Sequence, residues 1–407
     1  MQMIKGGLCA PNGFKATGIC CGIRPAHLEK NDIMMLFSEK ECTAAGLFTR
    51  NQVKAAPVLL DIETLKAGKA QAVIANSGNA NACAQDADEN ARAMQKAAAD
   101  ALGVDKNLVV VSSTGVIGQR LNIEAVKDAA PKLASALEHS ENGSEQAALA
   151  IMTTDTVKKE LACEVELAGK KVSIGAIAKG SGMIHPNMGT MLCFITTDCS
   201  ISSEMLRSAL KEVCDLTFNR ITVDGDTSTN DSLVILANGM AGNDEICKIN
   251  DDYIVFVEAL KQICTEMARQ MAADGEGAKH LITCNVKGTE TDKEAEIIAK
   301  SVVGSTLLKA AIFGCDANWG RVLCAMGYSG VSFNPEKVDV EFASKAGSID
   351  ICKNGRGLDF DEDKAKLILK EKEVIINITT GIGAGNATCW GCDITYDYIQ
   401  INGDYRT

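Results

Sequence analysis

The chain has 407 residues, of which 46% are hydrophobic and 23% are charged, as is usual for a globular protein with two or three lobes. Its 41 lysines and arginines against 53 aspartates and glutamates give a net charge of −12, which argues against a surface for nucleic acid or an anionic membrane. No apolar run is long enough to span a membrane, and the N-terminal residues lack a signal-peptide pattern, so we expect a cytoplasmic protein.

The first half of the chain alternates predicted strands and helices. We expect strands joined by tight turns over residues 5–25, followed by strands over 32–48, 71–75 and 107–113. Amphipathic patterns predict helices over 84–102, from 123 with an interruption near Pro131, and over 144–152. Alternating residues joined by Gly169-Lys170 then predict a hairpin over 160–178 that leads into Lys179.

The second half starts with an apolar, β-branched run over 191–197, which predicts a buried strand. Beyond it we expect helices over 202–215, 251–273 and 291–310, and strands over 232–237, 280–286, 338–342, 348–352, 373–379 and 387–402. This order, with many antiparallel strands, predicts an α/β fold built as a layered α+β sandwich rather than a doubly wound sheet. A division near residue 189 would give pieces 1–189 and 190–407, and neither looks like an independent domain.

The 17 cysteines are an odd number and are scattered, which predicts free thiols in a reducing compartment. Cys389-Trp-Gly-Cys392 has C-x-x-C spacing, but it lies in a predicted strand and has no second pair, so we expect no metal site. Gly381-Ile-Gly-Ala-Gly385 precedes a predicted strand rather than a helix, which indicates a hairpin turn instead of a dinucleotide loop. Cysteines in apolar runs should pack as small hydrophobes; they are Cys83, Cys163, Cys193, Cys214, Cys264 and Cys324.

Gly189 stands directly before Thr190, at the mouth of the predicted central strand. A glycine can turn its carbonyl group toward the following hydroxyl more readily than other residues can. Attack of the Thr190 hydroxyl on that carbonyl would form an ester by an N-to-O acyl shift, and hydrolysis would free Thr190 as a new N-terminus. The freed α-amine titrates near neutrality and can act as the base of a threonine nucleophile. A loop threonine with an ordinary satisfied hydroxyl is the alternative.

Five polar clusters stand at predicted helix or strand ends, where a rigid scaffold can present side chains: 76–81, 114–115, 153–156, 179–190 and 274–277. If they converge, Thr114 and Gly115 supply a hydroxyl and an N–H for an oxyanion, an effect worth about 3–4 kcal/mol per donor. Lys179 and Glu276 supply charges that match the two ends of a zwitterionic substrate. Taken singly, these residues also have ordinary explanations: Thr114 ends a strand, Lys179 is a solvated cation and Glu276 lies in a helix-terminal turn.

Longer ordered motifs run from the first strands to the last residue. Lys-Gly-Ser-Gly-Met-Ile-x-Pro-Asn-Met-x-Thr-Met-Leu over 179–192 is joined by motifs at 76–81, 113–118, 153–156, 224–231, 274–277, 318–321 and 402–407. In this combination the chain resembles the ornithine acetyltransferases, also called glutamate N-acetyltransferases, of arginine biosynthesis.

The resemblance implies an enzyme that cuts itself between Gly189 and Thr190 into α and β pieces, which fold together and assemble as an α2β2 heterotetramer. It implies a fold similar to, but topologically distinct from, that of N-terminal-nucleophile hydrolases. In the implied ping-pong reaction, Thr190 takes acetyl from N2-acetyl-ornithine and passes it to glutamate. No cofactor is implied, although some members also use acetyl-CoA. Thr114 and Gly115 would form the oxyanion hole, and the residues in contact with substrate would be Thr153, Lys179, Thr190, Glu276, Asn402 and Thr407.

Two positions depart from the family pattern. Gly189 replaces the usual alanine before the nucleophile, which the acyl shift tolerates, and Cys315-Asp-Ala317 replaces Arg-Asp-Pro, which leaves a role for that arginine open. Two other functions fit the same residues. An N-terminal-nucleophile aminopeptidase or amidase would pass the acyl group from Thr190 to water, and a non-catalytic amino-acid-binding protein would keep an intact chain.

Overall fold

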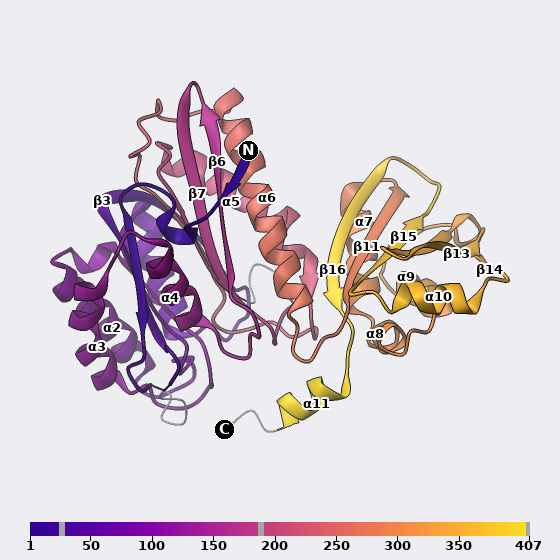
Figure 1. The fold of residues 1–407 in the computed structure, drawn as a ribbon, viewed down its shortest axis with the longest axis horizontal. Coiled ribbons are helices and arrows are strands. Elements are labelled where there is room, and N and C mark those ends of the chain that lie inside the picture. The colour runs from indigo at the N-terminus through magenta and orange to yellow at the C-terminus, as the bar shows by residue number, and fades with distance from the viewer. Residues whose placement is uncertain (24–28, 186–190, 404–407) are drawn as a thin grey trace.

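The computed structural model describes residues 1–23, 29–185 and 191–403, which form two lobes (Figure 1). Each lobe is a sheet covered by helices, so the predicted α/β class is confirmed. The calls on Gly189, Thr190 and Thr407 lie outside the described residues. Within those ranges, every helix is too short or too polar to cross a membrane.

The first lobe contains a sheet of nine described strands. The pairs β8/β10 and β4/β5 are parallel, and the other neighbours are antiparallel. In spatial order the strands are β1 (Gln2–Ile4), β6 (Lys159–Leu167), β7 (Lys170–Lys179), β8 (Leu192–Thr197), β10 (Ser232–Ala237), β3 (Ile33–Phe48), β4 (Lys69–Asn76) and β5 (Val109–Ser113), with β2 (Phe14–Ile19) paired to β3.

Helices pack against both faces of this sheet, and successive residues of each strand point to opposite faces. On β8, Leu192 and Phe194 pack into the core beneath α4, while Cys193 and Ile195 pack against α5 and α6. The helices of this lobe are α1 (Ala56–Thr64), α2 (Ala87–Leu102), α3 (Ile123–Ala136), α4 (Glu141–Ile151), α5 (Ser203–Leu216) and α6 (Asp251–Ala273). Both faces of the central strand β8 are thus packed in the core.

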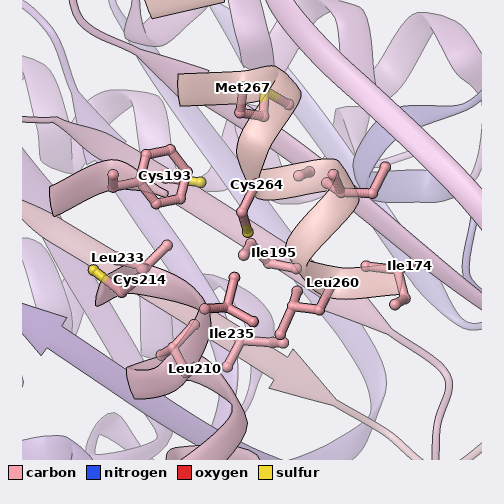
Figure 2. Close-up of a cluster of buried hydrophobic side chains, with 14 of the residues drawn as sticks. Ile174, Cys193, Ile195, Leu210, Cys214, Leu233, Ile235, Leu260, Cys264 and Met267 are labelled. Atoms are coloured by element: carbon pink, nitrogen blue, oxygen red, sulfur yellow. The ribbon is translucent and has the colours of Figure 1, made fainter. Parts of the chain in front are cut away.

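Cysteine serves as a core residue in this lobe. Figure 2 shows Cys193, Cys214 and Cys264 among leucine, isoleucine and methionine side chains, and burial raises the pKa of each of these thiols. All 17 cysteines are free thiols. The prediction of apolar packing is wrong for Cys83 and Cys324, which are exposed. Cys83 lies in the loop before α2, and Cys324 lies on the solvent side of the helix Trp319–Gly327.

The second lobe is built on a sheet of seven described strands in the order β14 (Arg356–Gly357), β13 (Gly347–Lys353), β12 (Asp339–Ser344), β15 (Glu373–Thr379), β11 (Leu281–Thr289), β16 (Gly385–Cys392) and β9 (Ile221–Thr222). One face packs against helices around residues such as Ile282, Ile376 and Phe342. These helices are α7 (Asp292–Gly304), α8 (Thr306–Phe313), α9 (Trp319–Gly327) and α10 (Glu362–Leu369). A last helix, α11 (Tyr396–Gly403), lies below the junction of the two lobes (Figure 1).

Strands from both sides of the predicted cut belong to the first sheet. β8 and β10, which follow residue 190, lie between β7 and β3, which precede it. The two predicted pieces are therefore interleaved rather than side by side. Whether the chain is cut there stays a prediction.

Four predicted elements differ from the structure. α3 continues through Pro131, which is tolerated because it lies on the exposed face where the unbonded carbonyl can be hydrated. The helix predicted over 291–310 is divided at Ser305, whose hydroxyl caps α8. The segment 380–384 is not a hairpin turn, since β11 lies between β15 and β16. The strand predicted over 387–402 ends at Cys392, and α11 follows.

Candidate active site

A cavity of about 110 Å³ lies where loops of the first lobe meet the C-terminal helix. We call it the site cavity. It collects every predicted site residue that the structure describes: Thr114, Gly115, Thr153, Lys179, Glu276 and Asn402. Met191, the residue after Thr190, also lines it, as do Ser228, Thr229, Asn230 and Asp231. The predicted convergence of separate polar clusters is thus found within the described part of the chain.

The loop that carries Thr114 and Gly115 is held by buried asparagines. Asn76 donates through Nδ2 to Ser113 Oγ at 2.7 Å, and its Oδ1 accepts the Asn79 N–H at 3.1 Å. From the segment just before β10, Asn230 Nδ2 donates to the carbonyls of Ala80 and Ser113 at 2.6 and 2.8 Å. These bonds tie the ends of β4 and β5 to the start of β10.

Gly115 is required at its position by both conformation and space. Its φ of +129° lies in a region that side chains disfavour, and a Cβ here would stand 2.9 Å from the Asn79 nitrogen. The Thr114 N–H is already used by the Asn76 carbonyl at 2.9 Å. The Thr114 hydroxyl and the Gly115 N–H have no partner among the described residues, so they are the two donors available to an oxyanion.

A buried ion cluster lies behind the cavity. Lys159 Nζ is 2.8 Å from Asp155 Oδ1 and 2.6 Å from Asp274 Oδ2, and the lysine and Asp155 side chains are fully buried. Burial by itself would raise the pKa of Asp155, but the positive charges of Lys179 and Lys159 outweigh it and lower that pKa to about 2. The Asp155 carboxyl group is therefore ionised at neutral pH.

The two carboxylates of this cluster organise the loops around them. Asp155 accepts the N–H of Thr153 at 3.0 Å and of Gly180 at 2.7 Å. Asp274 accepts the N–H and hydroxyl of Thr156, and its carbonyl accepts the Ser181 hydroxyl at 2.6 Å. Asp155 and Asp274 thus hold the loops that carry the predicted substrate-binding residues, and Lys159 joins the two carboxylates.

Glu276 also lines the cavity. Its Oε2 accepts a hydrogen bond from Asn402 Nδ2 at 2.7 Å, and its N–H donates to the Ser181 carbonyl at 3.0 Å. The carboxylate packs directly against Gly182, where any Cβ would overlap it. Although Glu276 is only 5% exposed, its charged end faces a space that a small amino acid could fill.

The described residues on either side of the predicted cleavage site make hydrogen bonds with the segment around β9 and β10. Asp224 accepts the N–H groups of Met183 and Ile184 at 2.6 and 2.9 Å, and the His185 carbonyl accepts the Thr227 hydroxyl at 2.9 Å. On the other side, the Met191 carbonyl accepts the Ser232 N–H at 2.9 Å.

Sequence reasoning missed four residues that shape the site: Asp155, Lys159, Asn230 and Asp231. Three of them lie inside motifs quoted above, but the motifs gave these residues no role. Lys159 stands at the start of an apolar strand, where a lysine usually indicates a solvated end. The sequence did contain a signal for these residues. Polar residues stand immediately before β6 and β10, and residues at strand ends are where a scaffold can present side chains to a site.

Comparison with known proteins decides the family. The family model of the ArgJ family matches residues 15–407. The chain belongs to the ArgJ family. It is 48% identical over 408 residues to the arginine biosynthesis bifunctional protein ArgJ of Symbiobacterium thermophilum, with 100% of both chains covered. It is 49% identical over 395 residues to ArgJ 1 of Clostridium acetobutylicum, with 97% of this chain and 96% of the relative covered.

Two solved structures of related proteins are also similar. A crystal structure of the arginine biosynthesis bifunctional protein argJ from Bacillus halodurans is 45% identical, covering 51% of this chain and 96% of its own, with a TM-score of 0.49. The ornithine acetyltransferase of Mycobacterium tuberculosis complexed with ornithine is 37% identical, covering 47% and 99%, with a TM-score of 0.43. The predicted family is confirmed by the matches along the sequence, and the chain is an acyltransferase of arginine biosynthesis.

Proposed function

We propose that the chain is a self-processing glutamate N-acetyltransferase that carries acetyl from N2-acetyl-ornithine to glutamate on Thr190. The observation that carries the proposal is the site cavity, in which Thr114, Gly115, Lys179 and Glu276 line the same space as Met191. Thr190 is bonded to the Met191 nitrogen and supplies the nucleophile. The substrates are supported by relatives that carry arginine biosynthesis in their names, and by one that is named an ornithine acetyltransferase.

Processing is the first step of the proposed mechanism. Thr190 Oγ attacks the carbonyl carbon of Gly189, the peptide C–N bond breaks, and an ester forms. Water then hydrolyses the ester to a Gly189 carboxylate and a Thr190 with a free α-amine. Because such amines have pKa values of about 7.7–8.0, a useful fraction is neutral at physiological pH and can accept a proton.

Acetyl transfer then proceeds in two half-reactions. The Thr190 amine takes the proton of its own hydroxyl while Oγ attacks the acetyl carbon of N2-acetyl-ornithine, and that proton passes to the nitrogen of ornithine as the C–N bond breaks. The neutral α-amine of glutamate attacks the acetyl ester, and Thr190 Oγ leaves and regains a proton. In both halves the Thr114 hydroxyl and Gly115 N–H donate to the oxyanion, worth about 3–4 kcal/mol each.

Substrate recognition would use the charges of the site cavity. Lys179 suits the carboxylate shared by both amino acids, and Glu276 with Asn402 suits the side-chain ammonium of ornithine. Thr153 lines the same space and can donate a hydrogen bond through its hydroxyl. Thr407 completes the predicted set, although it lies outside the described residues.

The bifunctional names of the relatives support acetyl-CoA as a second acetyl donor at the same threonine. Every group in this chemistry belongs to the chain itself, so the mechanism requires neither a cofactor nor a metal. The cut pieces would stay together because their strands interleave in one sheet. We further propose that two such pairs form an α2β2 heterotetramer, which light scattering of the cut protein tests.

Initial-rate kinetics test the acceptor. With N2-acetyl-ornithine and glutamate varied, double-reciprocal lines should be parallel, and acetyl-ornithine alone should leave one acetyl group on the fragment that starts at Thr190. Intersecting lines would contradict the ping-pong mechanism. Acetate release at the full rate without glutamate would instead make the protein an amidase.

A further inference from the structure

Asp231 is the last residue before β10, and the sheet register places it beside the start of β8. Ser232 pairs with Leu192 across these parallel strands, and the Ser232 N–H donates to the Met191 carbonyl at 2.9 Å. Asp231 lines the site cavity and is only 1% exposed. A carboxyl group is therefore fixed at the point where the backbone enters the central strand.

One oxygen of this carboxyl group is unsatisfied. In the described part of the chain, Asp231 Oδ2 is buried and has no hydrogen-bond partner. Burial raises the pKa of Asp231 well above its ordinary range, and the Ser228 hydroxyl, the Lys179 charge and the Thr49 hydroxyl offset only part of that effect. An unpaired buried carboxyl oxygen costs the folded state free energy, so its presence beside a reaction site needs a reason.

The other charged side chains that line the cavity already interact. Glu276 accepts the hydrogen bond from Asn402 at 2.7 Å. Lys179 lies close enough to lower the pKa of Asp155, which is also paired with Lys159 in the cluster behind the cavity. Among the charged side chains that the structure describes at the cavity, Asp231 Oδ2 is a buried oxygen without a hydrogen-bond partner, and an entering ammonium group would supply one.

We propose that Asp231 binds a primary ammonium group in the site cavity during the reaction. An ammonium carries the opposite charge and donates up to three hydrogen bonds, and it is small enough for this space. The inference rests on the proposed function, which supplies two sources: the amine freed at Thr190 and the ammonium groups of the amino-acid substrates. Either ion pair lets Asp231 ionise and holds an amine in place for binding or proton exchange.

Asp231→Asn tests the proposal because it removes the charge and keeps the shape. We expect kcat/KM to fall about 100-fold, while the thermal midpoint at pH 7 stays equal or rises because a buried amide replaces a costly carboxyl group. Asp226→Asn is the matched control, since it removes an exposed acid from the same loop and should leave both quantities unchanged. If a cut Asp231→Asn protein has the same kcat/KM as the parent protein, the inference is overturned and the acetyltransferase proposal stays intact.

Acetylation by p-nitrophenyl acetate, which has no ammonium group, distinguishes the two sources. If the partner is the Thr190 amine, Asp231→Asn slows this reaction and moves the acid limb of the pH–rate profile to lower pH, since loss of a negative neighbour lowers the pKa of the amine. Lys179 and Glu276 remain in both proteins, so that shift belongs to Asp231. If the partner is a substrate ammonium, the ester reacts at the parental rate and KM for an amino-acid substrate rises about 10-fold, or 1.4 kcal/mol.

Intact mass of the same samples separates this inference from the proposed function. A folded but uncut Asp231→Asn chain would also support the inference. The Thr190 amine is the leaving group when the Gly189–Thr190 bond breaks, and in this variant it would lose its ion-pair partner. A parent protein that is itself uncut would exclude the Thr190 amine as the partner and contradict the proposed processing.

Discussion

Lys159 Nζ lies 2.6 Å from Asp274 Oδ2, and this contact joins β6 to the loop that carries Glu276. The same ammonium lies 2.8 Å from Asp155 Oδ1, so one buried cation connects the segment that leads into β6 with the loop that follows α6. A catalytic site needs side chains held within a fraction of an ångström. The buried cluster provides that rigidity from behind the cavity without occupying it.

Lys159→Met should destabilise the protein strongly, because it leaves two carboxylates in a buried position without their cation. Removing one partner of a buried pair typically costs about 3–5 kcal/mol. Lys158→Met is the matched control: that lysine is 38% exposed, and its ion pairs with Glu145 and Glu160 should contribute at most about 1 kcal/mol. Urea unfolding of both variants checks the difference, and equal losses would contradict a central role for Lys159.

The Asp155 carboxylate should make the protein sensitive to acid. Its pKa falls from an ordinary value of about 3.9 to about 2 in the folded state, so its stabilisation is full above pH 4 and is lost as the pH falls toward 2. The free energy of unfolding should drop by about 2 kcal/mol across this window from this group. In Asp155→Asn this part of the decrease in unfolding free energy between about pH 4 and 2 should be absent. An unchanged acid dependence in the variant would contradict this assignment.

Gly115→Ala should abolish most activity, since a Cβ would press on the Asn79 nitrogen and displace an oxyanion donor. Loss of one such donor lowers kcat about 100- to 1,000-fold. Gly118→Ala also changes a glycine with a positive φ, +81°, but a Cβ there would meet open space. That control should cost about 1 kcal/mol of stability through strain and leave kcat within about twofold. Comparable kcat losses in both would exclude the steric explanation.

Asn402→Ala should weaken binding of ornithine more than it slows catalysis. Its amide donates to the buried Glu276 carboxylate at 2.7 Å, and a hydrogen bond to a charged group contributes about 1.5–3 kcal/mol. We therefore expect KM for N2-acetyl-ornithine to rise about 10-fold or more. Gln400→Ala, an exposed change on the same helix, controls for helix propensity. A loss confined to kcat would place Asn402 in the chemical step instead.

Much of the site could be predicted because its residues interrupt otherwise regular apolar elements. Thr114, Thr153, Lys179 and Glu276 all stand at element ends, and the structure brings them to one cavity. Asn402 also reaches this cavity, although the segment was predicted as a strand. Thr395 accepts the Tyr398 N–H and starts α11, a capping signal that the apolar pattern concealed.

The buried charges could not be predicted in the same way. Lys159 and Asp274 are 115 positions apart, and the nearby Asp155 does not reveal from the sequence that Lys159 is buried. Asp231 precedes an apolar strand, where an aspartate normally indicates a solvated turn. Only the fold shows that these groups are enclosed, because the enclosing elements come from distant parts of the chain.

The central claim is the nucleophile made by the chain itself, and intact mass under denaturing conditions tests it most directly. Protein purified from cells should give two fragments that meet between Gly189 and Thr190, and Thr190→Ala should give one uncut chain. A single uncut mass for the active parent protein would contradict the account, since Thr190 would then have no free amine to serve as its base.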